Sequence, residues 1–298
     1  MAGGMLAPWC ERESCGELIA RLGAESLPWW QARFPGTVVN GTLVVAHARD
    51  TGELLQFGRR TAHFERVGAD RIAGLEPELA GRFAHGLYFP EEGFLEPRAA
   101  LAALLDRLST LGVPVRFGLE ARPADLAGRT VVDCSGLEAR ATLADLRGVK
   151  GEMLLLHQQE IRLHRPVRLL HPRLPVYIVP RAPGLYMVGA TAIESDDAGR
   201  ITARSMLDLL SAAYALHPAF GEAGIVETAA GVRPAFPDNQ PRLRRVGGTL
   251  YVNGLYRHGF LIAPALARRA AGMVLDGREF PELLDADPGQ RDLARRAG

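Results

Sequence analysis

The segment YVNGLYRHGFLIAPALA, residues 251–267, combines residue types that suit ligand binding. A strand is expected to end at Asn253 and Gly254, and the loop after it carries Arg257, His258 and Gly259. A helix of small residues is expected to begin immediately afterwards. The first turn of a helix has free backbone N–H groups, and glycines let a ligand approach the backbone, so a negatively charged or electron-rich group fits here. The alternative is a glycine turn that joins strand and helix without a ligand.

A second candidate is AAGVRPAFPDNQP, residues 229–241, in which Arg233 stands between Gly231 and Pro234. A guanidinium held at a rigid turn can bind a carboxylate through two parallel hydrogen bonds. Tyr177, in an expected strand at 176–179, can offer its phenol to the same carboxylate. The alternatives are a salt bridge for the arginine and simple packing for the tyrosine.

Other chemistries find little support in the sequence. Cys10, Cys15 and Cys134 are too few for a disulfide framework, and their spacing predicts no metal site. Ser135 follows Cys134 at a strand end, but no G-x-S-x-G turn surrounds it. Neither G-x-G-x-x-G nor G-x-x-x-x-G-K-[ST] occurs in the chain, so the usual phosphate-binding loops are missing.

Composition is that of an ordinary globular protein with about two domains, with 47% hydrophobic and 23% charged residues in a chain of 298. The net charge of +1 gives no field that would recruit nucleic acid or anionic lipid. No apolar run approaches the ~20 residues that span a bilayer, and the N-terminus lacks the features of a signal peptide. These features predict a soluble, reduced, cytoplasmic protein.

The first half of the chain, before residue 150, has the pattern of mixed α/β structure. Helical spacing predicts a helix at 13–22 that Gly23 ends, and a clearer one from Pro97 to Gly112. The second helix carries one apolar stripe, formed by Leu101, Leu104, Leu105, Leu108 and Leu111. Short strands are expected at 113–117 and 130–134, which together with the helix resemble part of a parallel α/β sheet.

The middle of the chain, from about residue 151 to 191, has a different pattern, which is rich in predicted strands. Four strand candidates lie at 152–156, 167–170, 176–179 and 185–190, and they favour an antiparallel sheet. Asn40 and Gly41, between two β-branched runs, predict a tight hairpin. A helix at about 203–216, a strand at 249–252 and a helix at about 262–275 complete the pattern. We therefore expect two domains that interleave along the chain.

Six motifs in order give the chain a family resemblance: AGGMLAPW, VVDCSG, GVKGEM, VYIVPR followed by VGAT, ETAAGVRPAFPDNQP and NGLYRHGFLIAPAL. Together they resemble the D-amino-acid oxidase superfamily of FAD-dependent oxidoreductases, and within it the glycine oxidases of the thiamin pathway. The resemblance implies an FAD-binding, parallel-sheet domain interleaved with a mainly antiparallel β substrate domain. The implied divisions are 1–36, 97–147 and 231–298 for the FAD-binding domain, and 37–96 and 148–230 for the substrate domain.

The resemblance also implies roles for residues in these motifs. Arg233 would bind the substrate carboxylate, Tyr177 would hydrogen-bond it, and Arg257 would lie near the flavin edge and the substrate. Residues 2–6 would line the flavin. The loop 254–261 and the start of the helix after it would surround the flavin pyrimidine, where a helix N-terminus stabilises negative charge. The residues expected to contact the cofactor are Gly4, Met5, Leu6, Ser135, Gly136, Gly254, His258, Gly259, Phe260 and Leu261.

The implied reaction is oxidative deamination of glycine or a small D- or N-methyl amino acid, giving a 2-oxo acid, ammonia and hydrogen peroxide. Its partners would be the amino acid and oxygen, in service of thiazole formation, with homo-oligomers possible. Two alternatives stay open: a flavin dehydrogenase of the same superfamily, and a catalytically silent truncated remnant or fragment that cannot hold FAD alone.

The chain departs from the family at its start. In the family, AGGMLAPW lies some forty residues into the chain, after a β-α-β unit with the dinucleotide glycine motif, whereas here it begins at Ala2. We therefore expect the first β-α-β unit to be missing, through an upstream start or a truncation, and FAD binding by residues 1–298 to be weak or absent.

Overall fold

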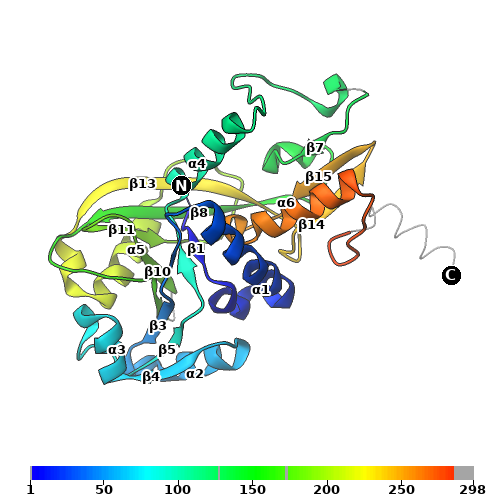
Figure 1. The fold of residues 1–298 in the computed structure, drawn as a ribbon. Helices are drawn as coiled ribbons and strands as arrows, with labels where there is room; N and C mark the ends of the chain where they lie inside the picture. Colours follow the sequence, from blue (N-terminus) through cyan, green and yellow to red (C-terminus); the bar gives the residue numbers. More distant parts are fainter. Residues whose placement is uncertain (1, 127, 172–173, 285–298) are drawn as a thin grey trace, which may run out of the picture.

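The computed structural model describes residues 2–126, 128–171 and 174–284 (Figure 1). Among these residues, no helix combines the length and apolarity that crossing a bilayer requires. The helices are α1 (Pro8–Arg33), α2 (Thr51–Arg60), α3 (Ala69–Leu75), α4 (Pro97–Thr110), α5 (Ala203–Leu216) and α6 (Gly259–Leu275). The strands are β1 (Met5–Leu6), β2 (Val38–Val39), β3 (Thr42–Ala46), β4 (Glu65–Gly68), β5 (His85–Phe89), β6 (Gly93–Phe94), β7 (Val132–Asp133), β8 (Arg147–His157), β9 (Val167–Leu170), β10 (Val176–Pro180), β11 (Leu185–Gly189), β12 (Ile193–Glu194), β13 (Gly224–Ala235), β14 (Arg242–Val246) and β15 (Thr249–Asn253).

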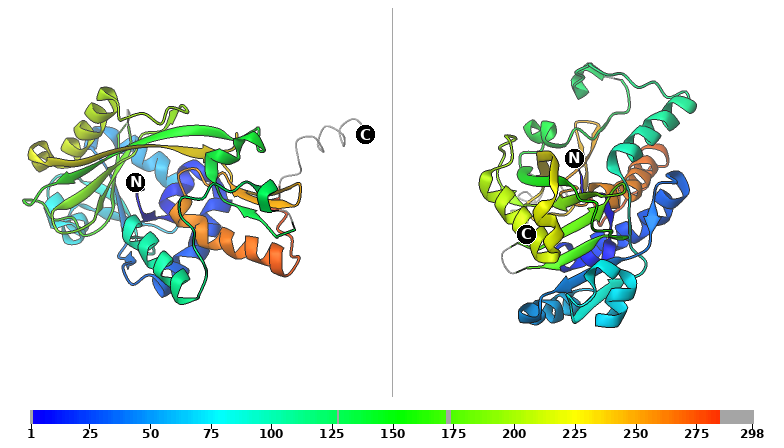
Figure 2. Two further views of the ribbon diagram at one scale, coloured as in Figure 1. Left: turned by 90° about the horizontal axis from the view of Figure 1, so that it is seen from above. Right: turned by 90° about the vertical axis from the view of Figure 1, so that its left-hand side faces the viewer.

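A nine-stranded, mainly antiparallel sheet forms the larger part of the molecule. Its order is β12-β8-β11-β10-β9-β3-β5-β4, and β13 also pairs with β8. The long strands β8 and β13 run side by side along the molecule (Figure 2). The four strand predictions in the middle of the chain are confirmed as β8 to β11. The predicted helix at 203–216 is α5, which buries Leu209, Ala213 and Leu216 in the core formed with this sheet.

Helices α1 and α6 lie side by side (Figures 1 and 2). Helix α1 extends beyond the predicted 13–22 at both ends, from Pro8, which suits a first turn, to Arg33. It is kinked at Gly16, whose φ of 77° and ψ of 176° are not helical. Gly23 does not end it. A Cβ there would lie 2.8 Å from the Leu261 side chain, so this glycine allows close packing of the two helices.

Two small sheets accompany the large one, in the orders β1-β6-β2 and β14-β15-β7. The parallel pair β7 and β15 agrees with the predicted parallel α/β element. The stretch 113–117 is not a strand in the structure, and Val113, Val115 and Phe117 are exposed. β-branched residues form a strand only where a neighbour supplies hydrogen bonds, and no described strand lies beside this stretch.

The helix predicted from Pro97 is confirmed as α4. Its apolar stripe is mostly exposed, because Leu101, Leu105 and Leu108 have little packed against them in the described part of the chain. Leu101 borders an open apolar hollow of about 580 Å³, which Trp29 and Phe260 also line.

The predicted hairpin at Asn40 and Gly41 is wrong. The two flanking strands do not pair: β2 joins β6 in one small sheet, and β3 joins β5 and β9 in the large sheet. Gly41 has a φ of 88°, so the chain does turn there, but the turn leads from one sheet into another. The Asn-Gly pair predicts only the local backbone conformation of the turn. Which strands pair with β2 and β3 depends on contacts with residues distant in the sequence.

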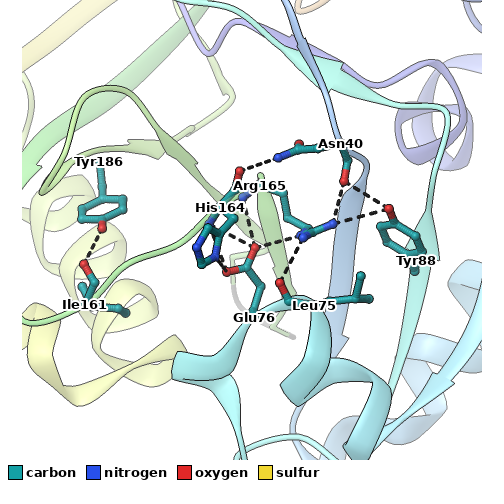
Figure 3. A network of polar contacts seen from close by, with 8 residues as sticks. All are labelled: Asn40, Leu75, Glu76, Tyr88, Ile161, His164, Arg165 and Tyr186. Atoms are coloured by element: carbon teal, nitrogen blue, oxygen red, sulfur yellow. Dashed lines mark hydrogen bonds and ion pairs between the residues drawn. The ribbon is translucent and has the colours of Figure 1, made fainter.

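The nine-stranded sheet is tied together by a buried carboxylate, Glu76, which directly follows α3 (Figure 3). Its oxygens accept hydrogen bonds from the backbone N–H of His164 and Arg165, and from Arg165 Nε at 2.9 Å. Arg165 donates in turn to the carbonyls of Asn40 and Leu75. One ion pair thus connects three segments that are far apart in the sequence.

We expect Glu76→Ala to lower the free energy of unfolding by about 3–5 kcal/mol, because it leaves the Arg165 cation without its partner. Urea unfolding measures this loss. Glu78→Ala is the matched control, since Glu78 lies in the same segment and forms no ion pair with another described residue. Equal stability of the two variants would contradict the prediction.

Candidate active site

A cavity of about 260 Å³ lies where the nine-stranded sheet meets β1 and the start of α6. It brings together segments from both ends and from the middle of the chain. The predicted residues that line it are Gly4, Met5, Tyr177, Arg233, Arg257, His258, Gly259, Phe260 and Leu261. It is also lined by Ala2, Gly3 and Tyr256, which lie in segments expected to contact the flavin. Sequence reasoning missed two further lining residues, Glu11 and Met153.

The sheet side of the cavity is built on a row of paired residues. Tyr177 on β10 pairs with Gly189 on β11, and Gly189 pairs with Met153 on β8. Paired residues in adjacent strands point to the same face, so Tyr177 and Met153 share this face on either side of Gly189. A Cβ on Gly189 would lie 2.9 Å from Met153, so the glycine leaves room for the methionine.

Arg233 on β13 folds back over Gly151 on β8. A Cβ on Gly151 would lie 1.9 Å from Arg233 Nη2, so the guanidinium occupies the space that any side chain at 151 would need. Arg233 donates from Nη1 to the Thr191 carbonyl at 3.0 Å. Burial lowers the pKa of Arg233, and no described carboxylate forms an ion pair with it. The cation is therefore desolvated and free to bind an anionic ligand.

The carbonyl that holds Arg233 is itself fixed. Thr191 Oγ1 donates to Glu152 Oε2 at 3.1 Å and accepts from the Glu152 backbone N–H at 2.9 Å. Glu152 is fully buried, and Lys150 Nζ lies 3.7 Å from it. These contacts set the direction of the Thr191 carbonyl and hence of the guanidinium.

The opposite side of the cavity is the N-terminus of α6. No side chain in the described part of the chain caps this helix, whose flanking residue is His258. The N–H groups of its first turn therefore lack intrahelical partners and carry a partial positive charge. Trp30 Nε1 donates to the Phe260 carbonyl at 2.7 Å and anchors the first turn to α1.

Glu11, in the first turns of α1, supplies a buried negative charge beside these groups. Its Oε2 lies 3.2 Å from His258 Nε2, and Arg168 Nη1 lies 3.6 Å from Oε1. Burial alone would raise the pKa of Glu11, but Arg257, His258 and Arg168 hold it well below its usual range. Glu11 is thus ionised and fixes His258 and Arg257 electrostatically. The only local sequence signal that could have marked Glu11 is its position as an acidic residue soon after Pro8, the proline that begins the helix.

Four predicted cofactor residues lie outside the cavity. Leu6 is fully buried in the core between α1 and α6. Gly254 has a φ of 76° and packs under Phe236, at a point where a Cβ would lie 2.3 Å from the ring. Ser135 and Gly136 are on the surface, and the Gly136 carbonyl accepts from Asn253 at 2.8 Å. Their predicted contacts with a cofactor stay predictions.

Helix α1 is capped from a distance by Glu92, which is fully buried. Its Oε1 accepts from the backbone N–H of Trp9 at 2.9 Å and of Cys10 at 2.6 Å. Burial raises the pKa of Glu92 to about 8, against the opposing effect of these N–H groups. The helix that carries Glu11 thus starts at a carboxyl group that is protonated at neutral pH.

We expect the stability of the protein to fall as the pH rises from about 5 to about 8. The unfolded chain releases the Glu92 proton at a lower pH than the folded chain, so ionisation costs up to ~1.4 kcal/mol of stability per pH unit in this interval. Glu92→Gln, which keeps an acceptor for Cys10, should flatten this part of the profile. Urea unfolding at several pH values tests it, with Glu65→Gln on the surface as control; parallel profiles for wild type and Glu92→Gln would contradict it.

The cavity fits the flavin that the motifs imply. The uncapped start of α6 offers donors and partial positive charge to an electron-rich ring. Gly3 and Gly4 form a narrow cradle: a Cβ on Gly3 would lie 3.0 Å from the Tyr177 ring, and one on Gly4, whose φ is 66°, 2.3 Å from the Leu95 carbonyl. Larger residues would close the space beside Tyr177.

Comparison with known proteins shows the family that this chain resembles. The model of the family "DAO: FAD dependent oxidoreductase" matches residues 1–273. A Rhizobium etli protein named for thiamine biosynthesis, the oxidoreductase ThiO, is 56% identical over 282 residues, which cover 94% of this chain and 86% of that protein. A glycine oxidase of Bacillus licheniformis is 31% identical, over 82% of this chain and 71% of its own.

The fold has solved counterparts. The crystal structure of glycine oxidase from Geobacillus kaustophilus superposes with a TM-score of 0.75 at 22% identity, covering 94% of this chain and 84% of that one. This likeness confirms the mixed α/β fold with parallel and antiparallel sheets. The family match over most of the chain goes further: the chain belongs to the DAO family of FAD-dependent oxidoreductases.

Proposed function

We propose that this protein is an FAD-dependent amino acid oxidase that converts glycine, or a small D- or N-methyl amino acid, into a 2-oxo acid, ammonia and hydrogen peroxide. The observation that carries the proposal is the desolvated guanidinium of Arg233. It lies beside Tyr177 in the cavity, without a carboxylate partner among the described residues, and opposite the N-terminus of α6. Such a cation calls for a small carboxylate as its ligand.

The roles of the residues follow from their places. Arg233 and Tyr177 bind the substrate carboxylate and hold the Cα toward the α6 side of the cavity. The chemistry that FAD would supply when bound is a two-electron oxidation of the substrate, with oxygen as the final electron acceptor. The start of α6 and Arg257 favour negative charge on that side, while Glu11 keeps Arg257 in place. No side chain need act as a base, since positioning and charge stabilisation suffice.

The named relatives support the choice of substrate and pathway. One is a glycine oxidase, and another is named for thiamine biosynthesis. We accordingly propose that the product serves thiazole formation for thiamin. We also propose the interleaved division into an FAD-binding domain (1–36, 97–147, 231–298) and a substrate domain (37–96, 148–230). The free cysteines Cys10, Cys15 and Cys134 suit a reducing cytoplasm. Assembly into homo-oligomers stays a prediction.

The first test is the visible spectrum of the purified protein before and after incubation with FAD and desalting, to show that flavin is retained. Oxygen consumption is then measured with glycine, sarcosine and D-alanine. We expect oxygen uptake with an equal amount of peroxide. Glycinamide, which lacks the carboxylate that Arg233 would bind, is the matched control and should not react.

Each other outcome has its own meaning. Flavin that glycine bleaches in the absence of oxygen, without peroxide formation in air, would indicate a dehydrogenase. A flavin-loaded protein that none of the three amino acids reduces would overturn the proposed substrate class. A protein that retains no flavin would be a silent member of the family.

A further inference from the structure

Arg181, the residue after β10, makes contacts that the function proposed above does not use. Its guanidinium donates to three backbone carbonyls: from Nη1 to Leu95 at 2.8 Å, and from Nη2 to Ala2 at 3.0 Å and Gly3 at 2.7 Å. Leu95 follows β6, and its own N–H donates to the Gly4 carbonyl at 2.9 Å. Arg181 therefore joins the segment before β1 to the strand that carries Tyr177.

This arginine is held without a counter-charge. Burial lowers the pKa of Arg181 to about 10, and no carboxylate among the described residues forms an ion pair with it. A desolvated cation is costly unless its donors are satisfied, and here neutral carbonyls satisfy them. Because Arg181 forms no ion pair with a described carboxylate, its main effect is to fix the direction in which these three carbonyls point.

The direction of a carbonyl decides the direction of the next amide. The peptide bond is planar and trans, so its N–H points opposite to its C=O. With the Ala2 and Gly3 carbonyls directed at Arg181, the N–H groups of Gly3 and Gly4 point to the other side of the segment. Gly3 and Gly4 line the active-site cavity, whereas Arg181 lines a separate cavity of about 290 Å³ on the far side of Ala2. Neither amide donates to another described residue.

We propose that Arg181 is a positioning residue that turns the amides of Gly3 and Gly4 into a pair of hydrogen-bond donors for the acceptor atoms of the flavin ring. The proposal rests on the FAD site, and it adds a residue that touches neither cofactor nor substrate. Two preset N–H donors directed at the ring favour the more negative, reduced ring over the oxidised one. Arg181 thus controls both cofactor affinity and reduction potential.

The test compares Arg181→Met with Arg98→Met. Arg98 lines the same far cavity, but its guanidinium pairs with Glu227 instead of the Ala2 and Gly3 carbonyls, so it is a matched control. FAD affinity is measured by titrating the apoprotein and following flavin fluorescence, and the midpoint potential by equilibration with reference dyes. We expect Arg181→Met to weaken FAD binding about tenfold or more and to shift the potential to more negative values. Arg98→Met should leave both within twofold of wild type.

Circular dichroism and thermal melting of the apoproteins show whether the variants fold. If Arg181→Met does not fold, Arg181→Lys carries the test, because an ammonium keeps the charge but lacks the planar fork that reaches three carbonyls. It should bind FAD several-fold more weakly and lower the potential by a smaller amount. A folded Arg181 variant with wild-type FAD affinity and potential would overturn the proposal. Since neither readout involves an amino acid, failure of the proposed substrate leaves this test intact.

Discussion

Replacement of Arg233 by methionine is expected to raise the KM for glycine by about 30-fold to several thousand-fold. Removing one member of a buried, hydrogen-bonded charge pair costs about 2–5 kcal/mol, and each 1.4 kcal/mol is a factor of ten. Methionine fills a similar volume over Gly151 but cannot bind a carboxylate. FAD affinity should stay close to that of wild type, because Arg233 extends from the sheet and not from the α6 side.

Steady-state oxygen uptake and a flavin titration together measure this effect. Arg140→Met is the matched control: Arg140 is a surface arginine that pairs with Asp196 and lies outside the cavity. Its KM should equal that of wild type. An unchanged KM in Arg233→Met would remove this residue from the substrate site, and a loss of flavin in that variant would assign it to the cofactor instead.

The second large effect is expected from a single methyl group, in Gly151→Ala. The new Cβ would stand 1.9 Å from the Arg233 guanidinium, so the arginine must leave its position over β8 and its hydrogen bond to Thr191. Displacing a substrate-binding group by an ångström or more costs on the order of 100-fold in kcat/KM. Most of the loss should appear in KM, as for Arg233→Met.

The opposite strand offers a matched control for this variant. Gly231 on β13 pairs directly with Gly151, and a Cβ there would meet nothing within 4 Å. Gly231→Ala should therefore keep wild-type kinetics. In the Arg233→Met background, Gly151→Ala should add little, since both changes remove the same interaction. Additive losses would show that Gly151 acts through something other than Arg233.

Much of the site could be predicted because its signals are local. The order strand, glycine loop, helix at 249–275 is encoded by neighbouring residues, and it places Arg257, His258 and Gly259 at an uncapped helix start. Tyr177 and Arg233 are marked by the motifs around them, and the structure brings both into the same cavity. The antiparallel strands at 152–190 also follow from local alternation and turns.

Tertiary structure decided what depends on contacts between distant segments. Asn40 and Gly41 form a turn but no hairpin, because β2 and β3 find their partners in different sheets. Gly151 and Arg233 are 82 positions apart, and their packing exists only because β8 pairs with β13 in one register. Glu11 and Arg181 act in the same way: each side chain gains its role from groups more than 80 residues away, through burial and charge that no local pattern records.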